Sequence, residues 1–303
     1  MDSSPSIPAG ASLPRNRQIA VDYWQKQRDR VTMVLLVLPV ALVALLFIVP
    51  LAYLVWLSFG GPASFSLQGY RELAAPVYLR LTLFTFQLAF TVTVACAIIA
   101  YPLAYVLANM SGVTARIMVV ALLVSLWLSV LARTFSWIII LQRNGLINSM
   151  LEGAGLTEEP LSLVYNQTGV YIGMIHILLP FMVMTLVPSL RAIDMSLVRS
   201  ALSLGAGPWT AFRRVYLPLS MSGVVSGSIL VFTMAIGFFI TPAILGGGRV
   251  TTIVIAIQNQ VQQLVDFRLA AATSVVLLVI SLAVLMLYEK VAGVDRIFGK
   301  GGR

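Results

Sequence analysis

Long apolar stretches dominate this chain and are separated by shorter polar ones. Crossing a bilayer takes about 20 residues of helix, and six of the stretches are about that long or longer. The pattern therefore predicts an all-α integral membrane protein with six transmembrane helices, over residues 31–58, 81–109, 117–141, 169–190, 223–245 and 270–288. These spans form one transmembrane domain, 31–290, between the polar tails 1–30 and 291–303.

One polar interruption, residues 191–220, is too long and too periodic to be a simple connection. A run without helix breakers over 195–204 predicts a first short helix. Gly205 follows it, and glycine commonly stands just past the end of a helix. Pro208 then occupies a position where proline is favoured, the first turn of a new helix. The interruption is thus predicted to be a helix, a glycine turn and a second helix.

The second of these helices carries an apolar face. Helical spacing places four residues on that face, Trp209, Phe212, Val215 and Tyr216, and directs Arg213 and Arg214 elsewhere. We expect Leu217-Pro218 to end the helix. An apolar face that is bordered by arginines and lies outside the bilayer indicates a surface on which another protein docks.

Composition supports the membrane interpretation. The 303 residues are 59% hydrophobic and 10% charged, whereas soluble domains are about 45–50% apolar and about 25% charged. One cysteine, Cys96, and one histidine, His176, both lie in apolar segments. This composition excludes a disulfide framework and a cysteine metal site, and we expect the chain to bind no metal and no cofactor.

The basic residues predict the topology. Cytoplasmic segments of membrane proteins carry an excess of lysine and arginine. With the N-terminus in the cytoplasm, fourteen of the 20 basic residues fall on the cytoplasmic side and five on the outer side. Both termini and the 191–220 loop are therefore predicted to be cytoplasmic. The same rule explains the net charge of +9 without nucleic-acid binding.

Motifs for catalysis or self-powered transport are not found in the sequence. It contains no P-loop, HExxH motif or nucleophile elbow, so we expect a transporter subunit rather than a membrane enzyme. No predicted span contains an aspartate or glutamate, although proton- and sodium-coupled carriers usually keep such a group near the midplane. A stand-alone carrier or channel remains the alternative, because sodium sites built from backbone carbonyls would not show this signal.

Arg133 is the one charge placed clearly inside a predicted span. Burying arginine in hydrocarbon is costly, so its side chain either reaches the outer interface or faces a translocation path or a neighbouring subunit. The tryptophans of the same span either pack or anchor the helix at the interface, or they face the translocation path. The candidate path residues are Trp127, Arg133, Trp137, Asn144 and Asn148.

The segment from Arg199 to Pro218 resembles the cytoplasmic loop of ABC importer permeases. That loop has Glu-Ala-Ala, three residues, glycine, nine residues and Ile-x-Leu-Pro. Ala201 matches the second alanine, Gly205 the glycine and Val215 the isoleucine, with Leu217-Pro218 at the end. The sequence departs from the family where Arg199 replaces the usual glutamate and Ser200 the first alanine.

Other stretches resemble the polyamine-type (spermidine/putrescine) branch of these permeases. They are AYPLAYVLA, RTFSWIIILQRNGLINSML, LPFMVMTLVPSLRAID and FFITPAILGG. The resemblance implies import of a small solute such as spermidine or putrescine across the bacterial inner membrane. Another small organic solute remains open, because no span supplies a carboxylate to a cationic substrate.

The resemblance also implies partners. These are two ATPase subunits that carry ATP and magnesium, a second, related but different permease, and a periplasmic binding protein. The ATPase would dock on residues Arg199, Ala201, Gly205, Ala206, Pro208, Trp209, Phe212, Val215, Leu217 and Pro218. We expect Gly205→Asp to uncouple or disassemble the complex because a side chain and its charge would fill the tight turn. We also expect the partner ATPase or the partner permease to carry an acidic residue opposite Arg199.

Overall fold

The computed structural model describes residues 15–62 and 65–292, and the chain divides into two units, Met1–Trp56 and Leu57–Arg303. Helix α1 (Arg15–Ser58) makes up the described part of the first unit. It begins well before the predicted span 31–58 because residues 15–30 contain neither glycine nor proline. From Pro39 to Ser58 the helix is long and apolar enough to cross a membrane.

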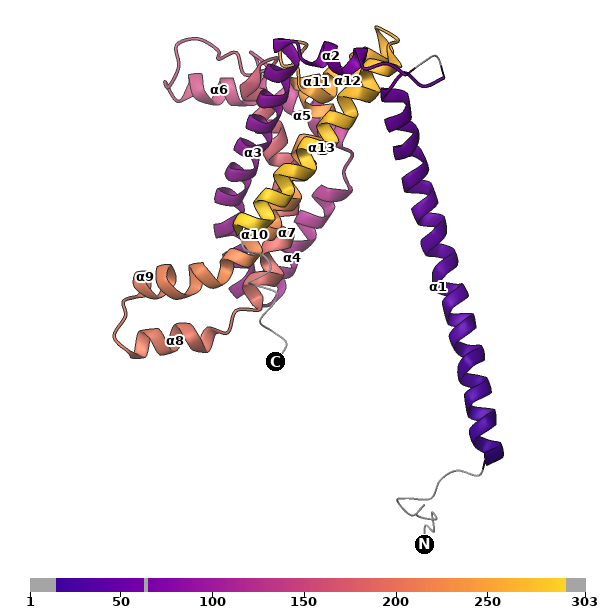
Figure 1. Cartoon of the computed structure of the whole chain (residues 1–303). Coiled ribbons are helices and arrows are strands. Elements are labelled where there is room, and N and C mark those ends of the chain that lie inside the picture. The colour runs from indigo at the N-terminus through magenta and orange to yellow at the C-terminus, as the bar shows by residue number, and fades with distance from the viewer. Residues whose placement is uncertain (1–14, 63–64, 293–303) are drawn as a thin grey trace. The chain divides into compact units, whose positions relative to one another are not determined.

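All regular structure among the described residues of the second unit is helical (Figure 1). Its elements are α2 (Gln68–Leu73), α3 (Pro76–Asn109), α4 (Val113–Trp127), α5 (Val130–Leu141), α6 (Leu146–Gly153), α7 (Gln167–Arg191), α8 (Met195–Ser203), α9 (Pro208–Ala211), the π-helical turn η1 (Phe212–Tyr216), α10 (Leu217–Ile236), α11 (Ile240–Leu245), α12 (Ile253–Gln262) and α13 (Phe267–Ala292). Five described helices can cross a membrane by length and composition, or six if the bent pair α4–α5 counts as one span.

The core of the second unit lies between α3, α7 and α10. Large side chains such as Leu88, Met174 and Met182 are fully buried there. Small residues let the helices approach closely, because a Cβ atom built on Gly227 would lie 2.6 Å from the sulfur of Met182. The same holds for Gly223, where a Cβ atom would lie 2.5 Å from Ser189. Van der Waals packing of small and large side chains therefore joins the three helices.

The predicted span 117–141 is not one continuous helix. The helix stops at Trp127, Leu128 and Ser129 are extended, and α4 is bent by 99° relative to the segment from α5 to α6. Ser129 is the N-cap of α5; its side chain makes no capping hydrogen bond, and its carbonyl accepts the N–H of Arg133 at 3.1 Å. Tertiary contact supplies the reason for the bend, since α5 packs on α7 and α11.

The predicted span 223–245 is also displaced. Helix α10 begins at Leu217 and ends at Ile236, where Gly237 interrupts it. Residues 240–245 form the separate helix α11, in which Pro242 occupies the first turn. Proline is tolerated there because its missing N–H has no partner within the helix.

Buried polar contacts join α12 to the bundle at the end away from α8 and α9 (Figure 1). The N–H of Ile253 donates to the Thr85 hydroxyl at 2.9 Å. The Thr273 hydroxyl donates to Oε1 of Gln260 at 3.1 Å, and Nε2 of Gln260 donates to the Tyr78 hydroxyl at 3.3 Å. These bonds satisfy polar groups that would otherwise be costly to bury.

Candidate functional site

The predicted helix–turn–helix protrudes from one end of the bundle as two antiparallel arms (Figure 1). We call residues 194–216 the hairpin, with α8 as its first arm and α9–η1 as its second. Asp194 is the N-cap of α8, and its carboxylate accepts the N–H of Ser196 at 2.8 Å. Hydrogen bonds from Ser196 lower the pKa of Asp194, and the charge of Arg199 on the next turn lowers it further.

Gly205 turns the chain between the arms in a Schellman motif. Its φ of +88° lies in the left-handed region that glycine alone adopts without strain. The Gly205 N–H donates to the Leu202 carbonyl at 3.0 Å, and the Ala206 N–H donates to the Ala201 carbonyl at 3.1 Å. These two bonds define the motif. They also explain why the sequence pattern needs a glycine at this position.

The reason given for the effect of Gly205→Asp is wrong. A Cβ atom built on Gly205 meets no other heavy atom within 4 Å, so a side chain would not fill the turn. Glycine is required for its backbone conformation instead, since a residue with a Cβ atom is strained at positive φ. Steric crowding therefore plays no part within this chain.

The second arm does not end at Leu217-Pro218 as predicted. Residues from Pro208 to Ile236 run as one helix through the π-helical turn η1, so the second arm is the first part of a membrane-crossing helix. In that turn the Leu217 N–H donates to the Phe212 carbonyl, five residues back. The wider turn accommodates Pro218, which cannot donate an α-helical hydrogen bond and whose ring would crowd the preceding turn.

An aromatic cluster fixes the second arm to α3. Tyr216 is only 3% exposed, and its ring centroid lies 5.2 Å from that of Tyr105. Phe212 contacts Tyr101 edge-on at 6.2 Å, and Trp209 stacks on Phe212 at 5.6 Å. The Tyr101 hydroxyl also lies 2.9 Å from the Ser220 hydroxyl oxygen. Packing of this kind makes the second arm a rigid extension of the bundle.

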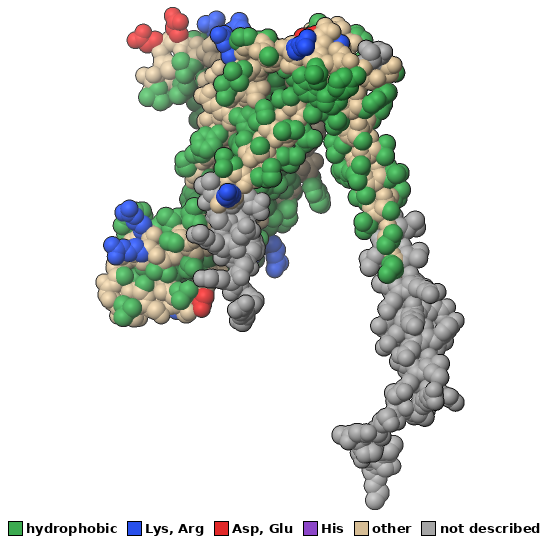
Figure 2. All heavy atoms as spheres, viewed as in Figure 1, with side chains coloured by type: hydrophobic (Ala, Val, Ile, Leu, Met, Phe, Trp, Pro, Cys, Tyr) green, Lys and Arg blue, Asp and Glu red, His purple; other side chains and the backbone are tan. Residues whose placement is uncertain are grey.

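The free side of the hairpin combines exposed apolar and basic side chains. Leu204 is 88% exposed and Trp209 is 70% exposed. The arginines of the hairpin are exposed as well, and Figure 2 shows basic and hydrophobic side chains together on this protrusion. Of the remaining predicted docking residues, Pro208 and Pro218 are exposed, whereas Ala201, Ala206, Phe212, Val215 and Leu217 are half-buried.

The structure brings together only part of the predicted translocation path. Arg133 is 7% exposed, and its Nε and Nη1 atoms have no hydrogen-bond partner among the described residues. Trp137 lies one turn further along α5, and its ring contacts His176 of α7 at 5.4 Å. Trp127, at the end of α4, is 88% exposed. Asn144 is exposed on the turn after α5.

Asn148 holds the backbone together at the end of α5. Its side-chain amide donates to the carbonyls of Gln142 at 3.1 Å and Leu161 at 3.0 Å. Its oxygen accepts the Leu161 N–H at 2.9 Å. Both amide hydrogens are thus used in the fold, and Asn148 ties the start of α6 to the segment before α7.

Within residues 15–62 and 65–292, no group of three His, Cys, Asp or Glu side chains is placed to hold a metal ion.

Sequence comparison identifies relatives of this chain. It is 32% identical over 224 residues to the spermidine/putrescine transport system permease protein PotB of Escherichia coli (strain K12), which covers 74% of this chain and 82% of that protein. The chain belongs to the ABC importer permease family. No protein-family model matches it. It is also 31% identical over 195 residues to the molybdenum transport system permease protein ModB of Mycobacterium bovis, which covers 64% of this chain and 72% of that protein.

Solved structures agree with this assignment at the level of the fold. A bacterial ABC transporter involved in the import of the acidic polysaccharide alginate matches 91% of this chain and 99% of its own chain, with a TM-score of 0.73 and 15% identity. A second alginate ABC transporter, in complex with an alginate pentasaccharide-bound periplasmic protein, matches with the same TM-score of 0.73 and 15% identity. This ABC importer permease is therefore a multi-pass membrane component of a transporter rather than an enzyme.

Proposed function

We propose that this permease couples ATP hydrolysis on a partner ATPase to solute movement through its hairpin. One observation carries the proposal: Trp209, the exposed residue of the predicted apolar face, lies on the same continuous helix that crosses the membrane from Pro208 to Ile236, whereas Phe212 and Tyr216 of that face pack on α3 instead. Movement of a protein bound at Trp209 is therefore transmitted along this helix into α10, inside the membrane. The ten residues from Arg199 to Pro218 predicted as the ATPase contact remain our proposal for it.

The coupling cycle follows from this rigid connection. Two ATPase subunits, each with ATP and magnesium, approach one another and carry the hairpins of two permease subunits with them. We take the second permease to be a related but different chain. The spans then change between inward-open and outward-open arrangements, a two-state device biased by contacts that differ between its states. No cofactor is assigned to this chain itself.

The topology proposed from the arginine distribution fits the helices. Counting α4 and α5 as one bent span yields six spans, with α1 as the first and α13 as the last. An N-terminus in the cytoplasm then places the hairpin and the C-terminus in the cytoplasm as well. Figure 1 supports this arrangement within the second unit, since the hairpin and α6 lie at opposite ends of the bundle.

A polyamine such as spermidine or putrescine is the proposed substrate, because the PotB relative is a spermidine/putrescine transport system permease. A periplasmic binding protein is proposed to deliver it, as an importer of the same fold has been solved with its periplasmic protein. Arg133, Trp137, Trp127 and Asn144 remain the proposed path residues. Asn148 is assigned to the fold instead because both of its amide hydrogens are used.

Reconstitution tests the proposed function. The full chain would be co-expressed with a candidate ATPase, second permease and binding protein from the same organism, and purified into liposomes. We expect uptake of labelled spermidine that requires both ATP and the binding protein and that resists ionophores. Leu204→Asp should abolish uptake and ATPase co-purification, whereas Leu146→Asp, at an exposed leucine at the other end of the bundle, should retain ATPase co-purification. Uptake without ATP that collapses with an ionophore would establish a secondary carrier instead.

A further inference from the structure

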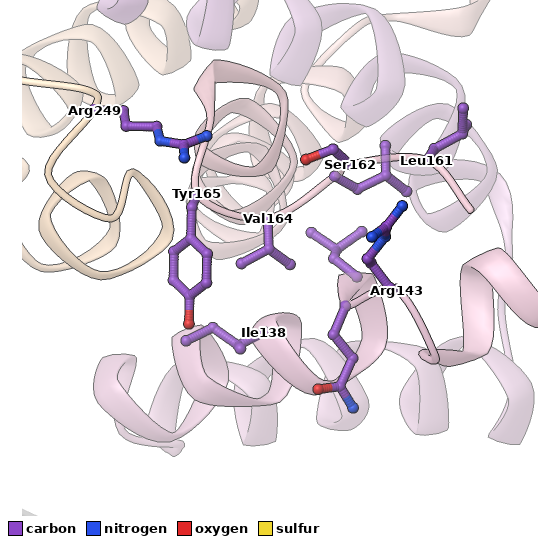
Figure 3. Close-up of a pocket in the computed structure, with 10 residues that line it drawn as sticks. Ile138, Arg143, Leu161, Ser162, Val164, Tyr165 and Arg249 are labelled. Carbon is purple, nitrogen blue, oxygen red and sulfur yellow. The ribbon is translucent and has the colours of Figure 1, made fainter. Parts of the chain in front are cut away.

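A cavity of about 360 Å³ lies at the end of the bundle opposite the hairpin. Its walls come from the last turn of α5, the segment between α6 and α7, and the loop between α11 and α12. Figure 3 shows Arg143 and Arg249 on opposite sides of this cavity, with Ser162 and Val164 between them. None of the side chains that line it is acidic. The cavity is therefore a positively charged pocket.

The wall that carries Ser162 is held from both sides. Asn148 makes two hydrogen bonds to the backbone of Leu161, as donor and as acceptor. The side chain of Asn166 donates to the carbonyl of Ser162, and its oxygen accepts the N–H of Gly169 at the start of α7. The hydroxyl of Ser162 is thus presented by a fixed backbone rather than by a loose loop.

The turn that carries Arg249 is equally constrained. Gly247 has a φ of +54°, and a Cβ atom there would lie 2.4 Å from the ring of Tyr165. Tyr165 itself has a φ of +59°, a conformation that non-glycine residues adopt rarely and that occurs mainly at functional sites. Val250, next along the chain, is buried. Close packing on Tyr165 therefore fixes the base of the Arg249 side chain.

The two guanidinium groups have nothing to neutralise them within the described chain. Among residues 15–62 and 65–292, neither Arg143 nor Arg249 takes part in an ion pair, and neither side chain makes a hydrogen bond. Arginine recognises carboxylate and phosphate groups through paired N–H donors. Two such groups on opposite sides of one pocket, with a hydroxyl between them, supply N–H and O–H donors of the kind that a phosphate group accepts.

The pocket lies beside the end of α5, which belongs to a helix pair long and apolar enough to cross a membrane. Its floor includes Ile138 and Leu141 in the last turn of α5, the end of a membrane-crossing pair. Tryptophan and tyrosine gather at the membrane interface, and Tyr165 lines this pocket. Helix α6 leaves the bundle sideways beside it (Figure 1) and exposes Leu146 and Met150 one turn apart, as a helix lying in the interface does.

We propose that this pocket, formed by Arg143, Arg249 and Ser162, binds the phosphate of an anionic phospholipid, whose acyl chains lie along the apolar outer turn of α5. A lipid phosphate fits both the basic rim and the apolar floor, whereas an acidic side chain of a docked protein would use the rim alone. Basic pockets between membrane helices on the cytoplasmic side bind anionic headgroups in this way, and we extend the same chemistry to the outer side.

Native mass spectrometry of the full chain, released from nanodiscs of equal phosphatidylglycerol and phosphatidylcholine, tests the proposal. We expect the retained lipid to be enriched in phosphatidylglycerol. Arg143→Gln and Arg249→Gln should each reduce the enrichment about fivefold, since one basic residue near an anionic lipid contributes roughly 1 kcal/mol. Arg249→Lys should keep most of it. Arg116→Gln removes the same charge from an exposed residue that does not line the cavity, so it is the control for general surface charge and should reduce the enrichment clearly less than either pocket variant.

Three results would overturn the proposal. The first is equal retention of both lipids, or an equal loss in Arg116→Gln, because either would reduce the effect to general electrostatics. The second is displacement of phosphatidylglycerol by millimolar inorganic phosphate, which would assign the pocket to the free anion. The third is unchanged lipid retention in Arg143→Gln and Arg249→Gln combined with weaker capture of the purified binding protein, which would assign the pocket to an acidic side chain of that protein.

Discussion

The two arms of the hairpin are attached to the molecule in different ways. The first arm, α8, contains no fully buried residue; it is held by its Asp194 cap, the Gly205 turn and the half-buried side chains of Met195 and Val198. The second arm buries Ala211 and Tyr216 and continues into α10. Local hydrogen bonds therefore contribute more to the first arm, and packing contributes more to the second. A change in the first arm should alter coupling alone, whereas a change at the base of the second should destabilise the bundle.

Tyr216→Ala should have the largest effect on stability. Removing a buried aromatic side chain costs about 3 kcal/mol, and Tyr216 packs against both Tyr105 and Phe212. We expect a clear drop in the thermal unfolding midpoint of the purified protein. Trp209→Ala is the matched control, because this aromatic belongs to the same stack but is 70% exposed. It should keep the midpoint and lose ATPase binding. Similar midpoints for both variants would contradict the distinction between the arms.

Gly205→Val should act on coupling with little change in the unfolding midpoint. Forcing a β-branched residue to a φ of +88° costs roughly 1–2 kcal/mol locally, and ATP-driven uptake should fall at least tenfold. Gly207→Ala is the control, since Gly207 has an ordinary φ of −67° and equally open surroundings. It should transport normally. Normal uptake by Gly205→Val would refute the turn as the pivot of the hairpin.

Asp194 makes the first arm sensitive to acid. Its pKa is lowered in the folded protein, so the carboxylate stabilises α8 fully above the unfolded value of 3.8. That stabilisation is lost as the pH falls below 3.8 and through the folded pKa. At pH 7, Asp194→Ala should raise hydrogen exchange of the α8 amides about fivefold, and Asp194→Asn should keep slow exchange because asparagine also caps helices. Exchange that is equally fast in both variants would argue against the cap.

Arg199→Glu should have the smallest effect on the isolated permease. The side chain is exposed, and surface substitutions usually change stability by less than about 0.5 kcal/mol. If the partner carries a compensating acid, the new glutamate faces a like charge and ATPase co-purification drops severalfold. Arg199→Gln should give an intermediate result. Unchanged co-purification in both variants would remove the basis for a compensated charge reversal. The charge of Arg199 would then act on Asp194 within the same arm.

Gly205 and Pro218 were both predicted from the sequence to be helix ends, and the structure confirms only the first. Gly205 was assigned correctly because a left-handed turn is a local property of the backbone. Pro218 was interpreted wrongly as a helix end. Proline removes one hydrogen bond, but a π-helical turn and the aromatic contacts of Tyr216 sustain the helix through it. The Asp194 cap had a sequence signal, an aspartate directly before a helical run, that could have been used.

Packing also explains which other elements were missed. Leu128 and Ser129 contain no strong breaker, yet α4 and α5 separate there. The hydroxyls of Thr134 and Thr241, 3.2 Å apart, mark where α5 meets α11, a contact between residues far apart in the sequence. Arg143 and Arg249 are likewise 106 positions apart and face the same pocket only in the folded chain. No local pattern reports such proximity.

The sequence by itself determined that the chain spans a membrane with helices, that a polar hairpin turns at Gly205, and which family the hairpin resembles. Each of these depends on hydrophobic length, charge distribution or backbone geometry within a few residues. Only the tertiary structure decided where the third span bends, how the second arm joins α10, and which arginines share a pocket. Those features depend on contacts between distant residues, whose packing energy overrides the local preference of the backbone.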